Sequence, residues 1–299
     1  MGYLHIDNLY KNRDILLFKE CYALEKIHGT SCHIIMEVKP NEITSIAFFS
    51  GGVNHNVFYA LFDREAMLKK FKEYGYSSIV VFGEGYGGKC QRMKDTYGPD
   101  LKFVAFDVKV GDIWLDVPDM EEVAKSFGLD VVDWVKIPTD MDLIDKERDK
   151  FSVQAAKCGC GEDKLREGIV LRPLTEMKTK NGKRVIVKHK GEEFSERVHT
   201  PKVRETDATK LQKLTDAKEV AEEWVTAMRL LHVIDKLPKV TGMEDTRRVI
   251  SAMIEDVQRE GEGEIEWSKQ VASAIGTRTA KIFKQYWHEL ARVEEKCLP

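Results

Sequence analysis

The periodicity of the apolar residues changes once along this chain of 299 residues, near Thr200-Pro201. Upstream, short apolar runs alternate with turns, and they predict strands over residues 31–38, 44–49, 79–82 and 103–108. Downstream, apolar residues recur at helical spacing. The sequence therefore predicts an antiparallel-rich α+β domain over residues 1–200 and a small all-helical domain over residues 201–299.

Three helical patterns interrupt the predicted strands of the first domain. Residues 63–74 predict a helix, and a second runs from about 119 to 127, where Gly128 closes it. A third pattern covers residues 143–157. With 42% hydrophobic residues, the chain is long enough for one large domain and a small one.

The overall charge does not point to a nucleic-acid partner, because the net charge is −3. Binding of a nucleic acid would need a local patch of positive charge. One candidate patch lies near the end of the first domain and comprises Lys178, Lys180, Lys183, Arg184, Lys188 and Lys190.

The sequence also bears on the compartment. No apolar run is long enough to span a membrane, and the first residues lack a signal-peptide pattern. Six cysteines are scattered without a C-x-x-C pair, and Cys158-Gly159-Cys160 has the wrong spacing for a common zinc site. We expect reduced thiols in a soluble, cytoplasmic monomer.

The run Glu25-Lys26-Ile27-His28-Gly29-Thr30 combines a lysine with a glycine three residues later. A lysine nucleophile needs desolvation or a nearby positive charge to lose its proton, and glycine lets a phosphate approach the backbone. The pattern alone is also compatible with a solvated lysine beside a turn. His28 is either a polar neighbour of this lysine or a substrate contact.

Further charged residues lie at two apolar runs downstream. Glu167-Gly168 precedes a β-branched run, and residues 185–190 predict another strand. Asn181-Gly182, between them, is a strong signal for a hairpin turn. Alternation along a strand places Lys188 and Lys190 on one face, where they either face an anion or protect a sheet edge from aggregation.

Taken together, these motifs resemble the covalent nucleotidyltransferase superfamily of polynucleotide ligases and mRNA capping enzymes. The form E-K-x-H-G-T is similar to the RNA ligase branch, in particular the RNA ligase 2-like group. Gly83-Glu84 matches the central glutamate motif of these enzymes, and residues 103–107 match their aromatic strand. The resemblance extends from about Leu9 to Lys190 and implies an ATP-grasp-like ligase domain.

The resemblance implies an ATP-dependent RNA ligase that acts in RNA repair or end joining. Lys26 would attack the α-phosphorus of ATP, AMP would pass to an RNA 5′-phosphate, and an RNA 3′-hydroxyl would displace the AMP. Glu167 would associate with Mg²⁺ or Mn²⁺. Lys188 and Lys190 would neutralise phosphate oxygens, and Lys188 would help to hold Lys26 neutral.

The same resemblance assigns residues to the nucleotide. Glu84 would bind the ribose and Phe106 would stack on the adenine. Glu25, Ile27 and Asp107 would complete the nucleotide site together with the two lysines at 188 and 190. The alternative for Glu84 is a purely structural role as a carboxylate in a turn, and the alternative for Phe106 is ordinary packing in the core.

Two features depart from the expected motifs. The RNA ligase 2-like group usually has a basic residue before a glycine in the strand after the nucleophile, whereas this chain has Ser50-Gly51. Residues 83–88 also match G-x-G-x-x-G, the dinucleotide-binding pattern. That pattern needs a helix directly after the glycines, and Tyr97-Gly98-Pro99 interrupts within a dozen residues. We therefore favour the ligase interpretation.

Other functions lead to different expectations. An ATP-dependent DNA ligase or a capping-type enzyme would have a β-rich OB domain after the lysine-rich strand, where this chain is predicted to be helical. A non-enzymatic nucleic-acid-binding module would not need Lys26, Glu167 and the lysine pair together. We expect the helical domain to handle the nucleic-acid substrate through basic residues, which are Arg204, Lys210, Lys213, Arg247, Arg248, Arg278, Lys281 and Lys284.

Overall fold

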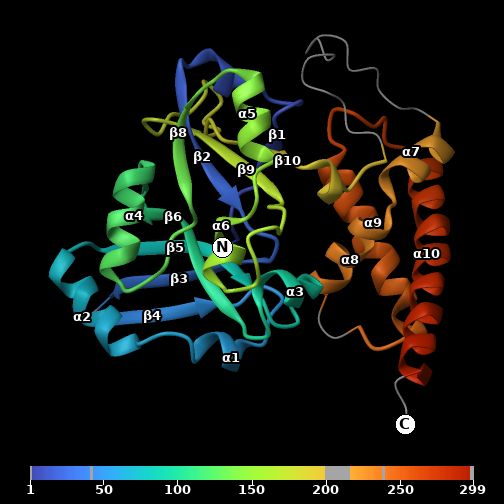
Figure 1. Ribbon diagram of the computed structural model, residues 1–299, viewed down its shortest axis with the longest axis horizontal. Helices are drawn as coiled ribbons and strands as arrows, with labels where there is room; N and C mark the ends of the chain where they lie inside the picture. Colours follow the sequence, from blue (N-terminus) through green and yellow to red (C-terminus); the bar gives the residue numbers. More distant parts are fainter. Residues whose placement is uncertain (1, 41–42, 199–215, 238–239, 297–299) are drawn as a thin grey trace. The chain divides into compact units, whose positions relative to one another are not determined.

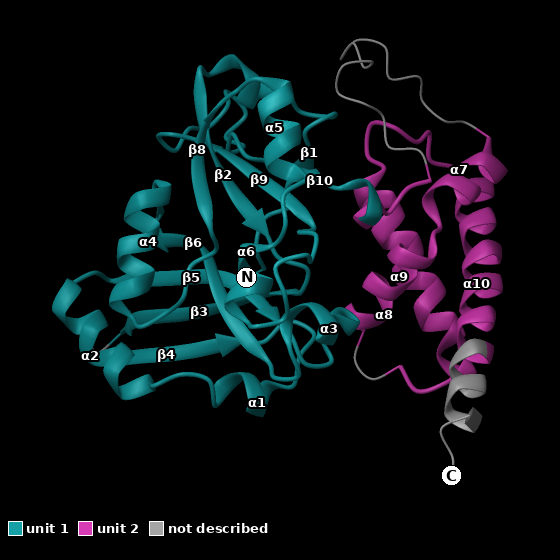
Figure 2. Ribbon diagram, viewed as in Figure 1, with its two compact units in different colours: residues 1–193 teal, residues 194–299 magenta. Residues whose placement is uncertain are grey.

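The computed structural model in Figure 1 describes residues 2–40, 43–198, 216–237 and 240–296. The chain divides into two compact units, residues 1–193 and 194–299 (Figure 2). The predicted boundary at residue 200 lies outside the described residues, as do Arg204, Lys210 and Lys213. The observed division falls between Glu193 and Phe194.

Two five-stranded sheets form the framework of the first unit. The first sheet has the order β1 (Asp7–Asn8), β10 (Val187–Lys190), β9 (Gly168–Pro173), β2 (Glu20–Lys26) and β8 (Trp134–Pro138). The second has the order β4 (Ile43–Phe49), β3 (Thr30–Lys39), β5 (Ser78–Tyr86), β6 (Lys102–Val110) and β7 (Ile113–Trp114). Every neighbouring pair is antiparallel except β1 with β10, so the prediction of an antiparallel-rich α+β domain is confirmed.

Three helices bury one face of the second sheet. They are α1 (His55–Tyr59), α2 (Arg64–Tyr74) and α4 (Val117–Ser126). Phe58, Phe71 and Met120 contribute one fully buried side chain from each helix to a core shared with the sheet. The helices predicted over 63–74 and 119–127 are thus confirmed. Short connections are η1 (Asp14–Leu17), η2 (Cys90–Arg92), α3 (Lys94–Tyr97) and η3 (Glu192–Phe194).

The single helix predicted over residues 143–157 is wrong, because two helices occupy this segment. They are α5 (Met141–Arg148) and α6 (Val153–Lys157). Ser152 caps α6, where its hydroxyl accepts a hydrogen bond from the amide of Ala155 at 3.0 Å. Phe151 instead forms an isolated β-bridge with Leu165. An N-cap and a bridge within the predicted helix explain the break.

The glycine-rich run at residues 83–88 begins inside a strand. Strand β5 continues through Gly83, Glu84 and Gly85 and pairs with antiparallel neighbours on both sides. A Cβ at Gly83 would lie 2.4 Å from the carbonyl oxygen of Val104, so only glycine fits at this position. Because these glycines are not in a loop that opens a helix, the dinucleotide-binding alternative is excluded.

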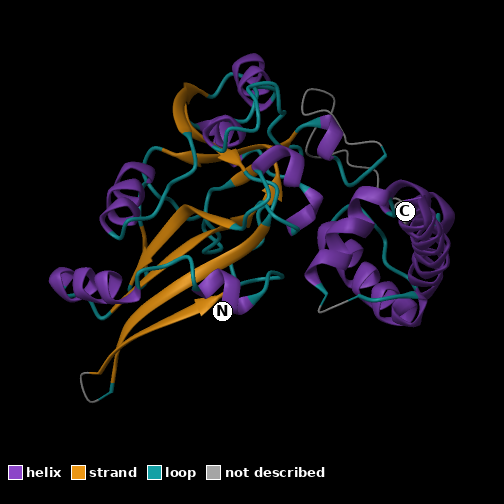
Figure 3. Cartoon of the chain, turned by 60° about the horizontal axis from the view of Figure 1, so that its bottom comes forward, coloured by secondary structure: helices purple, strands orange, loops and turns teal. Residues whose placement is uncertain are grey.

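The second unit is built from helices throughout its described residues (Figure 3). They are α7 (Ala217–Trp224), α8 (Ala227–Lys236), η4 (Met243–Asp245), α9 (Thr246–Glu260) and α10 (Lys269–Lys296). Trp224, Val249 and Phe283 are fully buried in its own core. The helical prediction for this part of the chain is confirmed. In the described parts of both units, no helix has the length and hydropathy needed to cross a membrane.

A buried ion-pair cluster, which we call the inter-sheet clamp, joins the two sheets. It consists of Asp107, Arg172, Glu176 and Arg184. Asp107 of β6 lies 3.1 Å from Arg172 of β9 and 2.6 Å from Arg184, and Glu176 contacts both arginines. Burial opposes the charge of Arg184, but the carboxylates of Asp107 and Glu176 raise its pKa. The clamp therefore holds the two sheets together with charges that stabilise one another.

Replacement of Asp107 with alanine tests the clamp. Asp107→Ala leaves Arg172 and Arg184 buried with Glu176 as the one remaining carboxylate of the clamp, and we expect it to lower the free energy of unfolding by about 3–5 kcal/mol. Urea denaturation measures the change. Asp112→Ala is the matched control, because Asp112 is fully exposed and its ion pair with Lys109 is on the surface. Equal losses in the two variants would contradict the importance of the clamp.

Candidate active site

In the first sheet, a glycine on the middle one of three adjacent strands lies between two lysines on its neighbours. Gly168, the first residue of β9, pairs with Lys26 at the end of β2 and with Lys190 at the end of β10. Its φ angle is +152°, and a Cβ there would lie 2.2 Å from the carbonyl oxygen of His189. Only glycine fits this position. The register therefore brings both lysines close to Glu167, the residue before the glycine.

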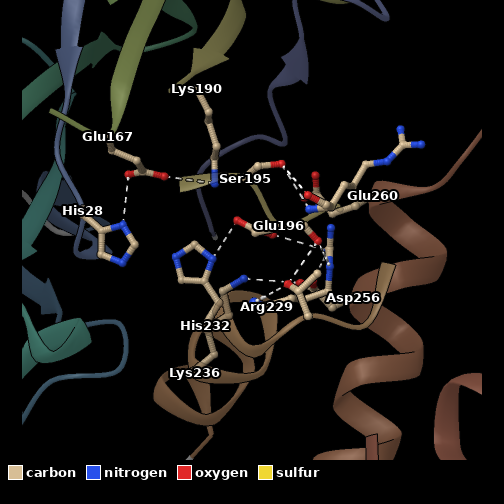
Figure 4. A network of polar contacts seen from close by, with 12 residues as sticks. His28, Glu167, Lys190, Ser195, Glu196, Arg229, His232, Lys236, Asp256 and Glu260 are labelled. Atoms are coloured by element: carbon tan, nitrogen blue, oxygen red, sulfur yellow. Dashed lines mark hydrogen bonds and ion pairs between the residues drawn. The ribbon is translucent and has the colours of Figure 1, made fainter. Parts of the chain in front are cut away.

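Glu167 holds the two lysine ammonium groups together. Its carboxylate is almost fully buried, and its Oε2 and Oε1 atoms lie 2.8 Å from Lys26 Nζ and 3.0 Å from Lys190 Nζ. His28 Nδ1 lies 3.7 Å from Oε2 of the same carboxylate. Figure 4 shows His28 and Lys190 on two sides of Glu167. Three of the four predicted catalytic residues are thus in one contact cluster.

The fourth predicted catalytic residue, Lys188, lies on the same strand as Lys190. It is partly buried and pairs with Val170 of β9. Alternation along β10 directs Lys188 and Lys190 to one face of the sheet. His189 points to the other face, where its Nε2 lies 2.7 Å from Asp145 of α5. The two lysines therefore face the same side as Lys26.

Glu25 and Ile27, expected at the nucleotide, contact other parts of the structure. Glu25 is buried and accepts hydrogen bonds from Ser152 Oγ and from the amides of Val153 and Gln154 at the start of α6. Burial raises the pKa of its carboxyl group. Ile27 is buried in the hydrophobic core. Neighbours of Lys26 in a strand point away from it, so neither side chain joins the lysine cluster.

The second sheet contributes Glu84 beside the cluster. A Cβ at Gly29 would lie 2.8 Å from Glu84 Cγ. The glycine at this position, three residues after Lys26, therefore lets Glu84 of β5 lie close to the backbone of Gly29. The amide of Gly29 donates a hydrogen bond to the Glu84 carboxylate. Burial raises the pKa of Glu84 to about 8, although Lys26 acts in the opposite direction. Glu84 is therefore a partly buried carboxyl group in the field of the lysines.

A β-bulge explains the orientation of Phe106. Phe82 pairs with Asp107 while Gly83 pairs with Ala105, so Phe106 is the extra residue in β6. The ring of Tyr3 lies 5.1 Å from Phe82 and 4.9 Å from Phe106, which places both side chains around one aromatic neighbour. Trp114 lies 5.9 Å from Tyr3 and extends this cluster. No sequence motif marked Tyr3 as part of it.

Asp107 belongs to the inter-sheet clamp. Both of its carboxylate oxygens contact arginines, and one also accepts a hydrogen bond from Tyr3 Oη at 2.7 Å. No sequence motif marked the arginines at 172 and 184 as its partners. A usable signal was present, because a charged residue inside or beside an apolar strand requires a buried counter-charge.

The basic patch predicted around the hairpin is only partly formed. Thr179 donates its amide to the carbonyl of Lys183 at 2.7 Å, which confirms the turn at Asn181-Gly182. Lys178, Lys180 and Lys183 are exposed, whereas Arg184 is buried in the clamp. Arg184 is therefore a structural residue of the fold.

Ser50, which stands where the RNA ligase 2-like group usually has a basic residue, lies in a turn. Ser50 Oγ donates a hydrogen bond to the carbonyl of Val53 at 3.1 Å, so its hydroxyl is part of a turn.

Within the described residues, no group of three or more His, Cys, Asp or Glu side chains could hold a metal ion. Glu167 offers the oxygen ligands that Mg²⁺ and Mn²⁺ prefer. Mg²⁺ commonly binds one carboxylate together with waters and substrate phosphates, and this donor set fits that arrangement.

The chain is similar to known proteins in two comparisons. Residues 19–190 match the family model described as RNA ligase. Solved structures of a Naegleria gruberi RNA ligase are similar to the chain. A mutant with ATP and Mn is 14% identical, with a TM-score of 0.49, and the match covers 65% of this chain and 57% of that chain. The same ligase with PPi is 13% identical, with the same TM-score and coverage. The chain thus spans less than two thirds of the length of these solved relatives.

The raised pKa of Glu84 predicts a pH-dependent stability. The folded pKa is about 8, and an unfolded glutamate has a pKa of about 4.3. The stabilising contribution of the protonated group is therefore complete below about pH 4.3 and is lost as the pH rises towards 8. Relative to Glu84→Gln, the wild-type protein without nucleotide or metal should lose unfolding free energy across this range.

Urea denaturation of both proteins at several pH values measures this difference. Glu73→Gln serves as a control, because Glu73 is an exposed glutamate of α2. A difference between the wild type and Glu84→Gln that stays constant from pH 5 to pH 8 would contradict the assignment.

Proposed function

Because this chain belongs to the RNA ligase family, we propose that its lysine–carboxylate cluster joins RNA ends through a covalent lysyl-AMP intermediate. The substrates are ATP and RNA that carries 5′-phosphate and 3′-hydroxyl ends. The observation that carries the proposal is the contact of one buried carboxylate, Glu167, with both Lys26 and Lys190. The biological role is RNA repair or end joining.

Lys26 is the nucleophile of the first step. Its Nζ attacks the α-phosphorus of ATP, a nitrogen–phosphorus bond forms, and the bond to pyrophosphate breaks. The hydrogen bond to Glu167 at 2.8 Å orients the amine before attack. Lys188 and Lys190 face the same side of the sheet and stabilise negative charge on the phosphate oxygens. Of these three lysines, Lys26 is the one at the end of β2, directly before the turn that contains Gly29.

The second sheet supplies the nucleotide contacts. Glu84, beside the lysines, binds the ribose hydroxyls. The bulged Phe106 offers its ring to the adenine, and its neighbour Tyr3 borders the same aromatic cluster. Asp107 acts indirectly, because the clamp that it forms fixes β6 against β9. Glu25 likewise positions the end of β2 by capping α6.

Glu167 would hold Mg²⁺ or Mn²⁺ together with waters and phosphate oxygens. When bound, the metal ion supplies positive charge to the phosphates of ATP and of the RNA end. In the later steps the AMP passes from Lys26 to the RNA 5′-phosphate, and the 3′-hydroxyl of the other end displaces it. The protein's own contribution to these steps is positioning and charge stabilisation by Lys188 and Lys190.

We also propose a compartment and an oligomeric state, each supported by one observation. None of the five described cysteines forms a disulfide, which supports a reducing, cytoplasmic compartment. Both compact units bury their own hydrophobic cores, which supports a monomer that gel filtration can test.

Lys26→Ala should abolish the covalent adduct. Incubation with labelled ATP and Mg²⁺, followed by a denaturing gel, detects the label on the wild-type chain. Lys178→Ala, which removes an exposed lysine of the hairpin, is the matched control and should keep the adduct. Persistent labelling of the Lys26→Ala protein would rule out this lysine as the nucleophile. Parallel sealing assays with RNA and DNA ends distinguish an RNA ligase from a DNA ligase.

Lys188→Ala and Lys190→Ala should each slow adduct formation by a factor on the order of 10² or more, because each removes a preorganised charge. Single-turnover labelling measures the rate. Lys180→Ala, at an exposed position of the hairpin, should form the adduct at the wild-type rate. A normal rate in Lys188→Ala would remove that lysine from the catalytic set.

A further inference from the structure

The helical unit carries a positively charged groove between α7 and α10. The groove has a volume of about 620 Å³, and four cationic side chains line it: Lys218, Lys269, Arg278 and Lys281. Glu222 is the one carboxylate among its lining residues. The lining therefore carries a net charge of +3, four positive charges less one, in a chain whose net charge is −3. Such a local reversal of sign indicates an anionic partner.

Helical spacing arranges these groups in a row. Lys269, Ser273, Thr277 and Lys281 are each four residues apart on α10. At a rise of 1.5 Å per residue, the two lysines lie about 18 Å apart along the helix. Lys218 adds a charge from the first turn of α7. The row is long enough to follow several consecutive phosphates of a nucleic-acid strand.

The groove cations differ from other basic residues of the same unit. Arg197 forms ion pairs with Glu223 and Glu264, and Arg229 forms an ion pair with Asp256 at 2.6 Å. By contrast, within the described residues no carboxylate lies within ion-pair distance of the four groove cations. Arg278 Nε donates a hydrogen bond to the carbonyl of Val225 at 3.0 Å, which fixes this side chain without cancelling its charge.

The uncharged lining residues indicate which part of a nucleic acid would bind. Ala221 and Ala274 lie in the groove and leave room for a chain to approach the helices. Ser273 is exposed and offers a hydroxyl group that can donate to a phosphate oxygen, whereas the Thr277 hydroxyl donates a hydrogen bond to the carbonyl of Ser273 at 2.9 Å. None of the described lining residues is aromatic, so the groove lacks a platform on which bases could stack.

We propose that the α7–α10 groove binds the sugar–phosphate backbone of the RNA substrate, without preference for base sequence. This inference rests on the proposed RNA ligase function, because that function supplies the class of partner. The groove would hold RNA beyond the end that reacts with the nucleotide. Its loss should therefore weaken RNA binding and sealing while leaving formation of the lysyl-AMP adduct intact.

Charge reversal in the full chain tests the proposal. The variant Lys269→Glu with Lys281→Glu removes two exposed groove cations, and the pair Lys269→Ala with Lys281→Ala is a second variant with a smaller perturbation. The matched control for the charge reversal is Lys39→Glu with Lys72→Glu, which changes the net charge as much as the double glutamate variant does, at exposed positions outside the groove. Fluorescence anisotropy with labelled single-stranded RNA of two unrelated sequences measures binding at several salt concentrations.

We expect both groove variants to bind either RNA more weakly than the wild type and the control. In the alanine variant, loss of two phosphate contacts should reduce the slope of log K against log salt by about 1.4, because each contact contributes about 0.7 on a single strand. Adduct formation should be unchanged in all variants. Groove variants that keep the wild-type affinity and salt slope would overturn the proposal.

Two further outcomes would also overturn it. Equal weakening by the groove variants and the control would mean that only the overall charge matters. Displacement of RNA by polyglutamate at equal charge concentration would identify a site for acidic peptides. A wild-type chain that forms no lysyl-AMP adduct but loses RNA binding on groove reversal would contradict the ligase function and leave the RNA-binding groove supported.

Discussion

The carboxylate of Glu167 is almost fully removed from water, and a buried charge of this kind is stable only with close partners. Lys26 and Lys190 provide them, at 2.8 and 3.0 Å. The three residues meet because Gly168 pairs with both lysines and tolerates a backbone conformation that other residues avoid. One glycine thus determines the register, and the register determines which charges face one another.

The inter-sheet clamp holds the second sheet beside this cluster. Asp107 and its arginines hold β6 against β9, and the bulge beside Asp107 turns Phe106 towards Tyr3. At Gly29, the absence of a side chain lets Glu84 approach the lysines. Under the function that we propose, a nucleotide would therefore contact the lysines of one sheet together with Glu84 and Phe106 of the other.

Local patterns predicted much of this arrangement, since strand alternation correctly placed Lys188 and Lys190 on one face. They failed where distant partners decide the outcome. The helix predicted over 143–157 divides because Ser152 caps α6 and binds Glu25, a residue 127 positions away. The contacts of Asp107 with its arginines span up to 77 positions. The groove on α7 and α10 depends on which cations lack a carboxylate neighbour, which sequence spacing does not reveal.

The central claim is that Lys26 carries AMP as a covalent intermediate. Peptide mapping by mass spectrometry, after incubation of the full chain with ATP and Mg²⁺ under conditions that preserve phosphoramidates, tests it most directly. We expect that one peptide, the one containing Lys26, gains the mass of AMP, and that added pyrophosphate removes it. An adduct on another residue, or an unmodified chain under conditions in which the protein is folded, would contradict the account.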